Sequence, residues 1–240
     1  MLAAVFVAGV CAIRLTIREL RREDIPRAAS LLSDAFAPPG GYNVLQQRII
    51  QAENEAGLSA RLGSSLALLA EQEEDNALVG SVEVLTPAFL EGKSLRFWNS
   101  SLPLESYVSA LAVAPGSRRS GVASALMDEV ERRAWDANES FVSLQVDVQN
   151  TPAVNLYRRL GYLVVGRDYA VTTLSRNALV TSLFLGGAKE RSLYVLQKAR
   201  PEPEPSSSST AAAAAAGGQP GRIVRWFRRA LARLKLSSAA

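Results

Sequence analysis

A short run of basic and small residues, Arg118-Arg119-Ser120-Gly121-Val122-Ala123, lies between an expected strand and an expected helix. Backbone N–H groups at a helix N-terminus have no intrahelical acceptors, and the helix dipole is positive there, so a diphosphate can bind to them. Gly121 and Ala123 leave room for phosphate oxygens close to the backbone, and the two arginines add positive charge. The run is consistent with a phosphate-binding turn, although on its own it fits an ordinary strand-to-helix turn better.

A second group of polar and aromatic residues follows the next expected strand: Asn150, Ala153, Asn155, Tyr157, Arg159, Gly161 and Tyr162. The chain of 240 residues has no histidine and one cysteine, Cys11. This composition excludes Ser-His-Asp and Cys-His triads, His-ligated zinc and thiolate metal cages. Proton transfer in this chain would therefore depend on tyrosine, carboxylate, serine, lysine, arginine or backbone groups.

Together the two groups resemble the motifs of the GCN5-related N-acetyltransferase (GNAT) superfamily. The acetyl-CoA motif of that family, Gln/Arg-x-x-Gly-x-Gly/Ala, matches Arg118, Gly121 and Ala123, and its second motif, Asn…Ala…Tyr…Gly-Phe/Tyr, matches residues 150–162. The resemblance covers residues 105–167, and the order of the flanking elements fits from about 13 to 198. It implies an α/β fold with a mixed, mostly antiparallel sheet, splayed central parallel strands and flanking helices.

The resemblance also implies how acetyl-CoA would bind as a co-substrate, with no metal. The pantetheine arm would enter the splay between strands 106–113 and 140–148 and pair with the backbone like an added strand. An amide near Leu111 or Val113 would polarise the thioester carbonyl. The pyrophosphate would lie on residues 118–123. The expected cofactor-binding residues are Leu111, Ala112, Val113, Arg118, Arg119, Ser120, Gly121, Val122, Ala123, Asn150, Ala153, Asn155, Tyr157 and Arg159.

Tyr157 matches the tyrosine of the family that protonates the departing thiolate; packing against CoA without proton transfer is the alternative. Because histidine is absent, a carboxylate acting through water is expected to take the proton from the substrate ammonium. Glu105 precedes strand 106–113 and shares strand parity with Leu111. Glu83, on the preceding strand, is the second candidate. Each of the two carboxylates could instead be an exposed edge residue.

Hydrophobic periodicity and turn residues predict the elements that must position these groups. We expect a helix that Asp24 caps and that runs through Phe36, and a helix closed by Gly161. The segments 86–104, with Phe97 and Trp98, and 168–190 are irregular. Strands are expected at 12–20, 65–70, 77–85, 106–113, 140–148, 162–167 and 191–197, and further helices at 44–61, 120–137 and 151–160.

The two ends of the chain differ from the body in composition. Residues 1–12 are predicted to be a disordered leader, residues 13–200 the GNAT domain, and the Pro/Glu- and Ser-rich segment 201–221 a disordered linker. The last forty residues carry the whole net charge of +4, so no nucleic-acid-binding face is expected on the body. Residues 222–236 form a basic amphipathic pattern, which fits an anionic membrane surface or docking on the body or a partner.

The expected function is acetyl transfer from acetyl-CoA to a protein N-terminal α-amine or a lysine ε-amine. A closed acidic or aromatic pocket around Tyr42, Phe97 and Trp98 would favour a small amine instead, such as an aryl-alkylamine, polyamine or amino acid. A membrane-tethered acetyl-CoA-binding module without turnover is the alternative of another class. The motif segment looks most like single-domain GNATs of bacteria and of plant and algal plastids, and the Ala/Ser-rich linker favours the algal type. We therefore expect a chloroplast protein, with the cytoplasm as the alternative.

Overall fold

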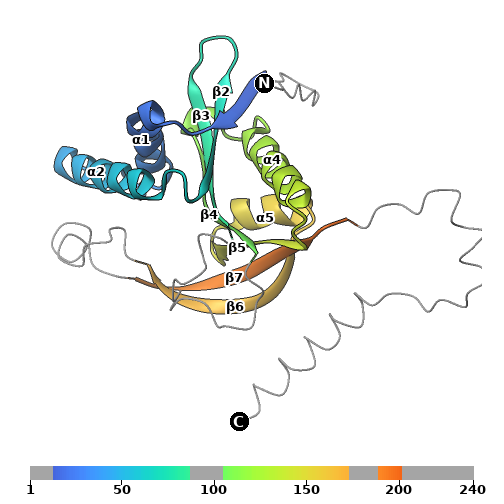
Figure 1. The fold of residues 1–240 in the computed structure, drawn as a ribbon. Coiled ribbons are helices and arrows are strands. Elements are labelled where there is room, and N and C mark those ends of the chain that lie inside the picture. Colours follow the sequence, from blue (N-terminus) through green and yellow to red (C-terminus); the bar gives the residue numbers. More distant parts are fainter. Residues whose placement is uncertain (1–12, 87–104, 173–188, 202–240) are drawn as a thin grey trace, which may run out of the picture. The chain divides into compact units, whose positions relative to one another are not determined.

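The computed structural model describes residues 13–86, 105–172 and 189–201. The described strands are β1 (Leu15–Glu19), β2 (Leu66–Gln72), β3 (Leu78–Leu85), β4 (Ser106–Val113), β5 (Phe141–Asp147), β6 (Leu163–Thr172) and β7 (Lys189–Ala199). The described helices are α1 (Ile25–Ala35), α2 (Val44–Arg61), α4 (Val122–Asp136) and α5 (Thr151–Arg159) (Figure 1). Their order confirms the order expected from the sequence.

The chain divides into two units, Met1–Arg200 and Pro201–Ala240, and every described helix and strand belongs to the first. Several predictions from the sequence lie outside the described residues. These are the leader 1–12, the linker from residue 202 onward, the basic segment 222–236, and the two aromatic side chains Phe97 and Trp98.

The seven strands form one sheet in the order β1-β2-β3-β4-β5-β7-β6. All neighbours are antiparallel except β4 and β5, which are parallel. These two strands pair at only three positions, the last of them Val108 with Leu144. Beyond this point β4 continues to Val113 and β5 to Asp147, so the two strands separate. The expected mixed sheet with splayed central strands is therefore confirmed.

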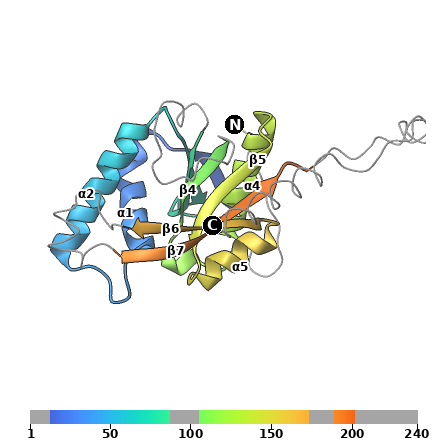
Figure 2. The ribbon, with the colours of Figure 1, turned by 90° about the horizontal axis from the view of Figure 1, so that it is seen from below.

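Helices cover both faces of the sheet, with α1 and α2 on one side and α4 and α5 on the other (Figures 1 and 2). A large apolar cluster on the α4 side contains Val82, Val108, Leu126, Leu144 and Tyr157. A smaller cluster lies beneath α1 and α2. Burial of these apolar surfaces is the main force that holds the two helical layers on the sheet.

Gly80 of β3 allows the N-terminus of α4 to pack unusually close to the sheet. A Cβ atom at this position would lie 2.6 Å from Cγ1 of Val122 and 3.0 Å from Cδ1 of Leu126. Val122 is the first residue of α4. The missing side chain at Gly80 therefore fixes where the first turn of this helix begins relative to β3.

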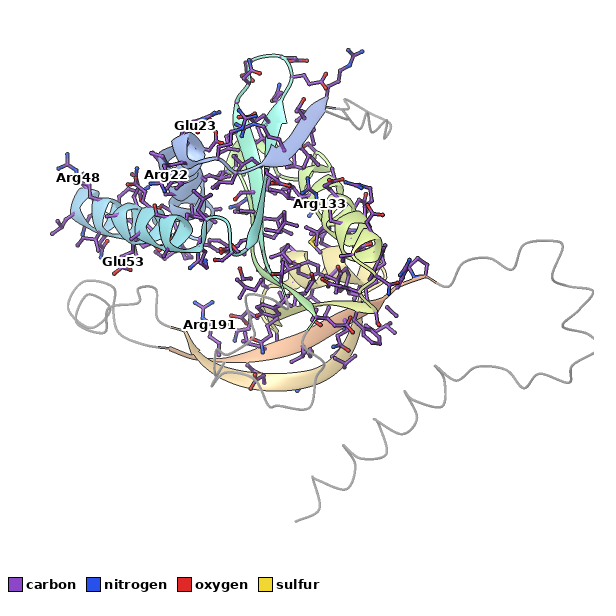
Figure 3. All side chains as sticks on the ribbon, viewed as in Figure 1. Arg22, Glu23, Arg48, Glu53, Arg133 and Arg191 are labelled. Atoms are coloured by element: carbon purple, nitrogen blue, oxygen red, sulfur yellow. The ribbon has the colours of Figure 1, made fainter. Side chains whose placement is uncertain are left out.

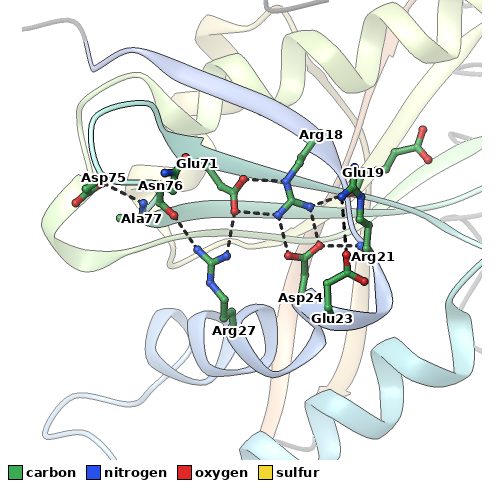
Figure 4. Close-up of polar contacts among 10 residues, drawn as sticks. All are labelled: Arg18, Glu19, Arg21, Glu23, Asp24, Arg27, Glu71, Asp75, Asn76 and Ala77. Atoms are coloured by element: carbon green, nitrogen blue, oxygen red, sulfur yellow. Dashed lines mark hydrogen bonds and ion pairs between the residues drawn. The ribbon is translucent and has the colours of Figure 1, made fainter. Parts of the chain in front are cut away.

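A charged network on the opposite face joins β1, β2 and the start of α1 (Figure 4). The Arg18 guanidinium donates to both oxygens of Asp24, at 2.6 and 2.7 Å, and to both oxygens of Glu71, at 2.8 and 2.9 Å. Arg27 donates to Glu71 and to the carbonyl oxygen of Asn76. Asp24 is the N-cap residue of α1, as predicted, but its carboxylate makes no cap bond to this helix and instead accepts from Arg18 and the Arg21 N–H.

This network should make stability depend on acid pH. Hydrogen bonding to Arg18 lowers the pKa of Asp24 from 3.8 to about 2. A lowered folded-state pKa adds stability above the unfolded value, which is lost as the pH falls from about 4 through 2. We expect Asp24→Asn to lower the free energy of unfolding by about 2–3 kcal/mol at pH 7, because a buried charged partner is lost. Urea unfolding at pH 7 and pH 2.5 should show the difference from wild type narrowing in acid.

Glu23→Gln is the matched control for this prediction. The Glu23 side chain is 69% exposed and lies 3.8 Å from Arg21, so its loss should change stability by less than about 0.5 kcal/mol. Equal losses in the two variants at pH 7, or a loss in Asp24→Asn that is the same at both pH values, would contradict the assignment.

Candidate active site at the splayed strands

The amides of β4 that face β5 lie where the two strands separate. The Ala114 N–H donates to the Val79 carbonyl of β3, at 2.9 Å. Successive amides of a strand point to opposite edges, so the N–H groups of Val113 and Leu111 point away from β3. In the described part of the chain, β5 is paired with β4 only as far as Val108, so no strand lies opposite these two amides. They can accept a ligand that binds like an added strand.

A β-bulge in β4 decides which amides face the opening. Glu83 of β3 lies opposite Ala110, whereas its neighbour Val84 lies opposite Val108, so Ser109 is the extra residue. Val108 and Leu111 both pack with the apolar cluster on the α4 side. The parity predicted from the sequence is therefore wrong, because the bulge places Leu111 on the face opposite Tyr107. Ser109 is the exposed residue of β4, as expected at an opening in the sheet.

The first turn of α4 forms one end of the site. Gly121 is its N-cap, with φ of +88°, and Arg119 also has a left-handed φ of +68°. The Ser120 hydroxyl donates to the Ser117 carbonyl, at 2.5 Å, and so closes the turn. A Cβ atom built on Gly121 meets nothing within 4 Å. The turn is thus open around Gly121, and the first N–H groups of a helix, which lack intrahelical acceptors, suit a bound diphosphate.

The other residues expected in this turn are exposed or half-buried, except for Val122. Arg118 and Arg119 are exposed, and Nη2 of Arg118 donates to the Ala35 carbonyl at the end of α1, at 3.4 Å. Ala123 is half-buried, while the Val122 side chain is buried in the core. Val122 can therefore contribute to the site through its backbone N–H alone.

α5 places the second motif beside the end of β5. The Asn150 side chain accepts the Ala153 N–H at 3.3 Å and so caps this helix. Asn155 and Arg159 are exposed, and Ala153 packs against the core. Gly161, with φ of +89°, ends the helix as predicted. The motif thus combines a structural side, which holds α5 on the sheet, with an exposed polar side.

Tyr157 lies on the buried side of α5. Its side chain is 7% exposed and packs edge-to-face with Tyr162, with ring centroids 5.8 Å apart. Burial, and then the nearby Tyr107, raises the pKa of Tyr157. Its hydroxyl therefore stays protonated at neutral pH, which is the state required of a proton donor.

Glu105 does not face the opening. Its carboxylate accepts the backbone N–H of Phe141, the first residue of β5, and Glu139 accepts the N–H of Ser106 at 2.8 Å. Both contacts lie at the closed end of the β4–β5 pair. Burial raises the pKa of Glu105, but its position argues against the predicted role as the base, because it joins the starts of the two strands.

Glu83 does lie beside the bulge, but its carboxylate is fully engaged. Arg61 binds it through Nε to Oε1 and through Nη2 to Oε2, the latter at 2.9 Å. The Ser65 and Ser109 hydroxyls lie 3.2 Å from Oε1 and Oε2. Both carboxylate oxygens are therefore engaged, each by the Arg61 guanidinium and by a neighbouring serine hydroxyl. The structure therefore argues against Glu83 as a base, and also against an exposed edge residue, since it is 8% exposed.

A row of three polar side chains and one ion pair near the opening were not predicted from the sequence. The Tyr107 hydroxyl donates weakly to Gln145, at 3.4 Å, and Gln145 donates to Asp168, at 3.0 Å. Burial and Asp168 raise the pKa of Tyr107 to about 12. Arg191 pairs with Asp147 at 3.0 Å and extends from β7 toward α2 (Figure 3). These contacts join residues far apart in the chain, so no local pattern could have indicated them.

Two further features bear on the chemistry of the site. No group of three or more His, Cys, Asp or Glu side chains in the described ranges could hold a metal ion. Within the same ranges, no helix has both the length and the apolar character needed to span a membrane.

Parts of the chain are similar to acetyltransferases of known name. The N-terminal acetyltransferase B complex catalytic subunit naa20 of Schizosaccharomyces pombe is 43% identical over 61 residues, which are 25% of this chain and 34% of that protein. Streptothricin acetyltransferase of Streptomyces lavendulae is 34% identical over 74 residues, 31% of this chain and 37% of that protein. The chain thus spans about a third of the length of these two relatives.

The fold is similar to that of solved acetyltransferase structures. The ribosomal-protein-S18-alanine N-acetyltransferase of Escherichia coli matches with a TM-score of 0.53 and 17% identity, over 79% of this chain and 97% of that chain. The sequence model of the Acetyltransferase (GNAT) family matches residues 30–162, which is more than half of the chain. This match, on a fold with splayed central strands, shows that the chain belongs to the GNAT acetyltransferase family.

Proposed function

We propose that this protein is an N-acetyltransferase that moves the acetyl group of acetyl-CoA directly to a primary amine. The observation that carries the proposal is the pair of β4 amides, Leu111 and Val113, at the splay, with the open first turn of α4 at its end. The two amides can hold a pantetheine arm, and the turn of α4 can hold a pyrophosphate. Residues 118–123 and the exposed side of α5 would hold the rest of the co-substrate.

In this proposal the chain acts mainly by positioning and by electrostatics. Acetyl-CoA supplies an activated acyl group, so no covalent enzyme intermediate is required. The Leu111 amide donates to the thioester oxygen as negative charge develops on it. Tyr157 gives a proton to the departing thiolate. We assign the ammonium proton to solvent water, which carries it to the bulk, because the described structure engages Glu83 and Glu105 elsewhere.

For the acceptor, we propose a protein N-terminal α-amine, a lysine ε-amine, or both. Support comes from the similarity to a relative whose name is that of an N-terminal acetyltransferase catalytic subunit. A small amine is the second candidate, because the other relative is named as an acetyltransferase of streptothricin. Mass spectrometry of a proteome before and after incubation with the protein and acetyl-CoA tests the choice. New acetyl groups on N-termini or lysines support the first candidate, and none on any protein contradicts it.

Gly121, in the turn before α4, is expected to lie against the pyrophosphate. Gly121→Glu adds bulk and negative charge there, so calorimetry should detect no binding of CoA to this variant. Gly63→Glu is the matched control, since Gly63 also has a positive φ, of +81°, with nothing within 4 Å of an added Cβ. It introduces the same charge and a similar backbone strain in the α2–β2 turn. Unchanged CoA affinity in Gly121→Glu would contradict the assignment.

The second site prediction concerns the proposed acid. Tyr157→Phe should keep the affinity for CoA and lower kcat by ~10²–10⁴-fold, as expected when a general acid is removed. Tyr162→Phe is the control, because it removes the hydroxyl of the adjacent buried tyrosine, and the family motif accepts Phe there. Steady-state kinetics at saturating acetyl-CoA measure both. A loss of only a few-fold in Tyr157→Phe would reduce this residue to a packing role.

We further propose that residues 222–236 bind an anionic membrane surface and that 201–221 act as their linker. The spacing of four arginines, Arg222, Arg225, Arg229 and Arg233, would place them on one side of this segment if it were helical. Each contributes about 1 kcal/mol near such a surface, and salt weakens the attraction. Deleting residues 205–240 should abolish co-sedimentation with anionic vesicles and leave acetyl transfer to a soluble peptide intact.

Two results of the vesicle experiment would contradict the membrane proposal. Equal vesicle binding by the full-length and truncated proteins would refute the membrane proposal. A collapse of activity on truncation would instead indicate that the segment docks on the catalytic body.

A further inference from the structure

The carboxylate of Glu83 connects the end of α2 to the bulge of β4. Arg61, the last residue of α2, binds both of its oxygens, and the Ser109 hydroxyl lies 3.2 Å from Oε2. Glu83 is 8% exposed, and the Arg61 side chain 16%. A partly buried, bidentate pair of this kind has a fixed geometry. The position of the helix end is thus transmitted through two side chains to one residue of β4.

Ser109 is the residue at which this connection could affect chemistry. It is the extra residue of the bulge, so the residues of β4 that follow it have their N–H directions shifted by one position relative to a regular strand. Without that extra residue the Ala110 amide, rather than the Leu111 amide, would face the splay. The hydroxyl of Ser109 also lies 3.4 Å from the Glu83 carbonyl oxygen. A hydrogen bond that fixes Ser109 therefore also fixes the direction of the Leu111 N–H.

The opposite end of the connection is a helix with few buried residues, which is also hydrogen-bonded to α1 through Gln47 and Asn54. Of the eighteen residues of α2, only Ile50, Gly57 and Leu58 are buried. The Arg61 carbonyl accepts the amides of Ser64 and Ser65, each at 3.0 Å, which fastens the turn that follows. Arg61 is thus held at its backbone by this turn and at its side chain by Glu83.

We propose that Arg61, Glu83 and Ser109 form a positioning chain that fixes the β4 bulge, and with it the amide that receives the thioester oxygen. Glu83 is then a positioning residue and not the base. The proposal rests on the proposed acetyl transfer, since the Leu111 amide is given its role there. It extends that function by making the rate of transfer depend on where the end of α2 lies.

Ser109→Ala is the principal test, because Ser109 is exposed and the loss of its hydroxyl does not threaten folding. Its kcat should fall about ten- to a hundredfold, since a displacement of about 1 Å at the reacting groups has an effect of this size. The KM for acetyl-CoA should stay unchanged. Ser109→Thr keeps a hydroxyl and should restore kcat to near the wild-type value. A wild-type kcat in Ser109→Ala would overturn the proposal.

Glu83→Gln separates positioning from base catalysis. Its kcat should fall by the same factor as that of Ser109→Ala, and its pH–rate profile should keep its shape. The variant that carries both substitutions should be no slower than the slower of the two single variants. A loss of 10²–10⁴-fold together with loss of one limb of the profile would make Glu83 the base. Glu71→Gln, which also removes a carboxylate held by an arginine, is the control and should keep the wild-type kcat.

Amide resonances give a readout that needs no turnover. In a ¹⁵N–¹H spectrum of the full chain, the Leu111 signal should shift in Glu83→Gln and in Ser109→Ala but stay in place in Glu71→Gln. An unshifted Leu111 signal in the first two variants would overturn the positioning chain. If the wild-type protein transfers acetyl to no acceptor, the proposed function fails, and these shifts alone then decide the positioning chain.

Discussion

Two backbone N–H groups of β4, those of Leu111 and Val113, point to an edge of the strand where the neighbouring strand has already moved away. Backbone donors in the middle of a sheet normally have partners, because an unpaired buried donor is costly. Here β5 has separated from β4, so the N–H groups of Leu111 and Val113 make no bond to that strand and can bind a ligand instead. The surrounding structure keeps β4 and β5 paired at one end and apart at the other.

Different contacts hold the closed and open ends of the splay. At the closed end, Glu105 binds the start of β5, and Val108 and Leu144 are the last paired residues. At the open end, the close packing of Gly80 with Val122 sets the start of α4. On the other face, Arg18 ties β1 and β2 to the beginning of α1. The site is therefore built on rigid elements, which is what catalysis by positioning requires.

The sequence predicted the elements well wherever local signals determine them. The range 44–61 matches α2. This helix begins with a capping box of Asn43 and Gln46, which depends only on residues three positions apart. The range 106–113 matches β4, and the positive φ of Gly161 ends α5 as expected. β6 and β7 extend beyond their predicted ranges because they pair with each other along almost their whole length. That pairing has no signal within either strand.

The candidate site was predicted for its backbone features and less well for its side chains. The glycine turn and Tyr157 follow from short motifs with a local mechanism. The bulge at Ser109 does not, because a register shift depends on the facing strand, and it reversed the expected parity of Leu111. The ion pair of Glu83 with Arg61 was also not predicted, since the two residues are 22 positions apart in the chain. Pairings at this distance depend on tertiary structure alone.

Amide hydrogen exchange at β4 shows directly whether the co-substrate binds to these two amides. We expect the N–H groups of Leu111 and Val113 to exchange readily in the free protein and to become protected when CoA is added. The Ala114 amide donates to Val79 of β3, and strand alternation directs the Ala112 amide to the same strand, so both should be protected with and without CoA. NMR-detected exchange resolves these four amides individually. No gain of protection at Leu111 and Val113 at saturating CoA would contradict a site in which the co-substrate binds as an added strand.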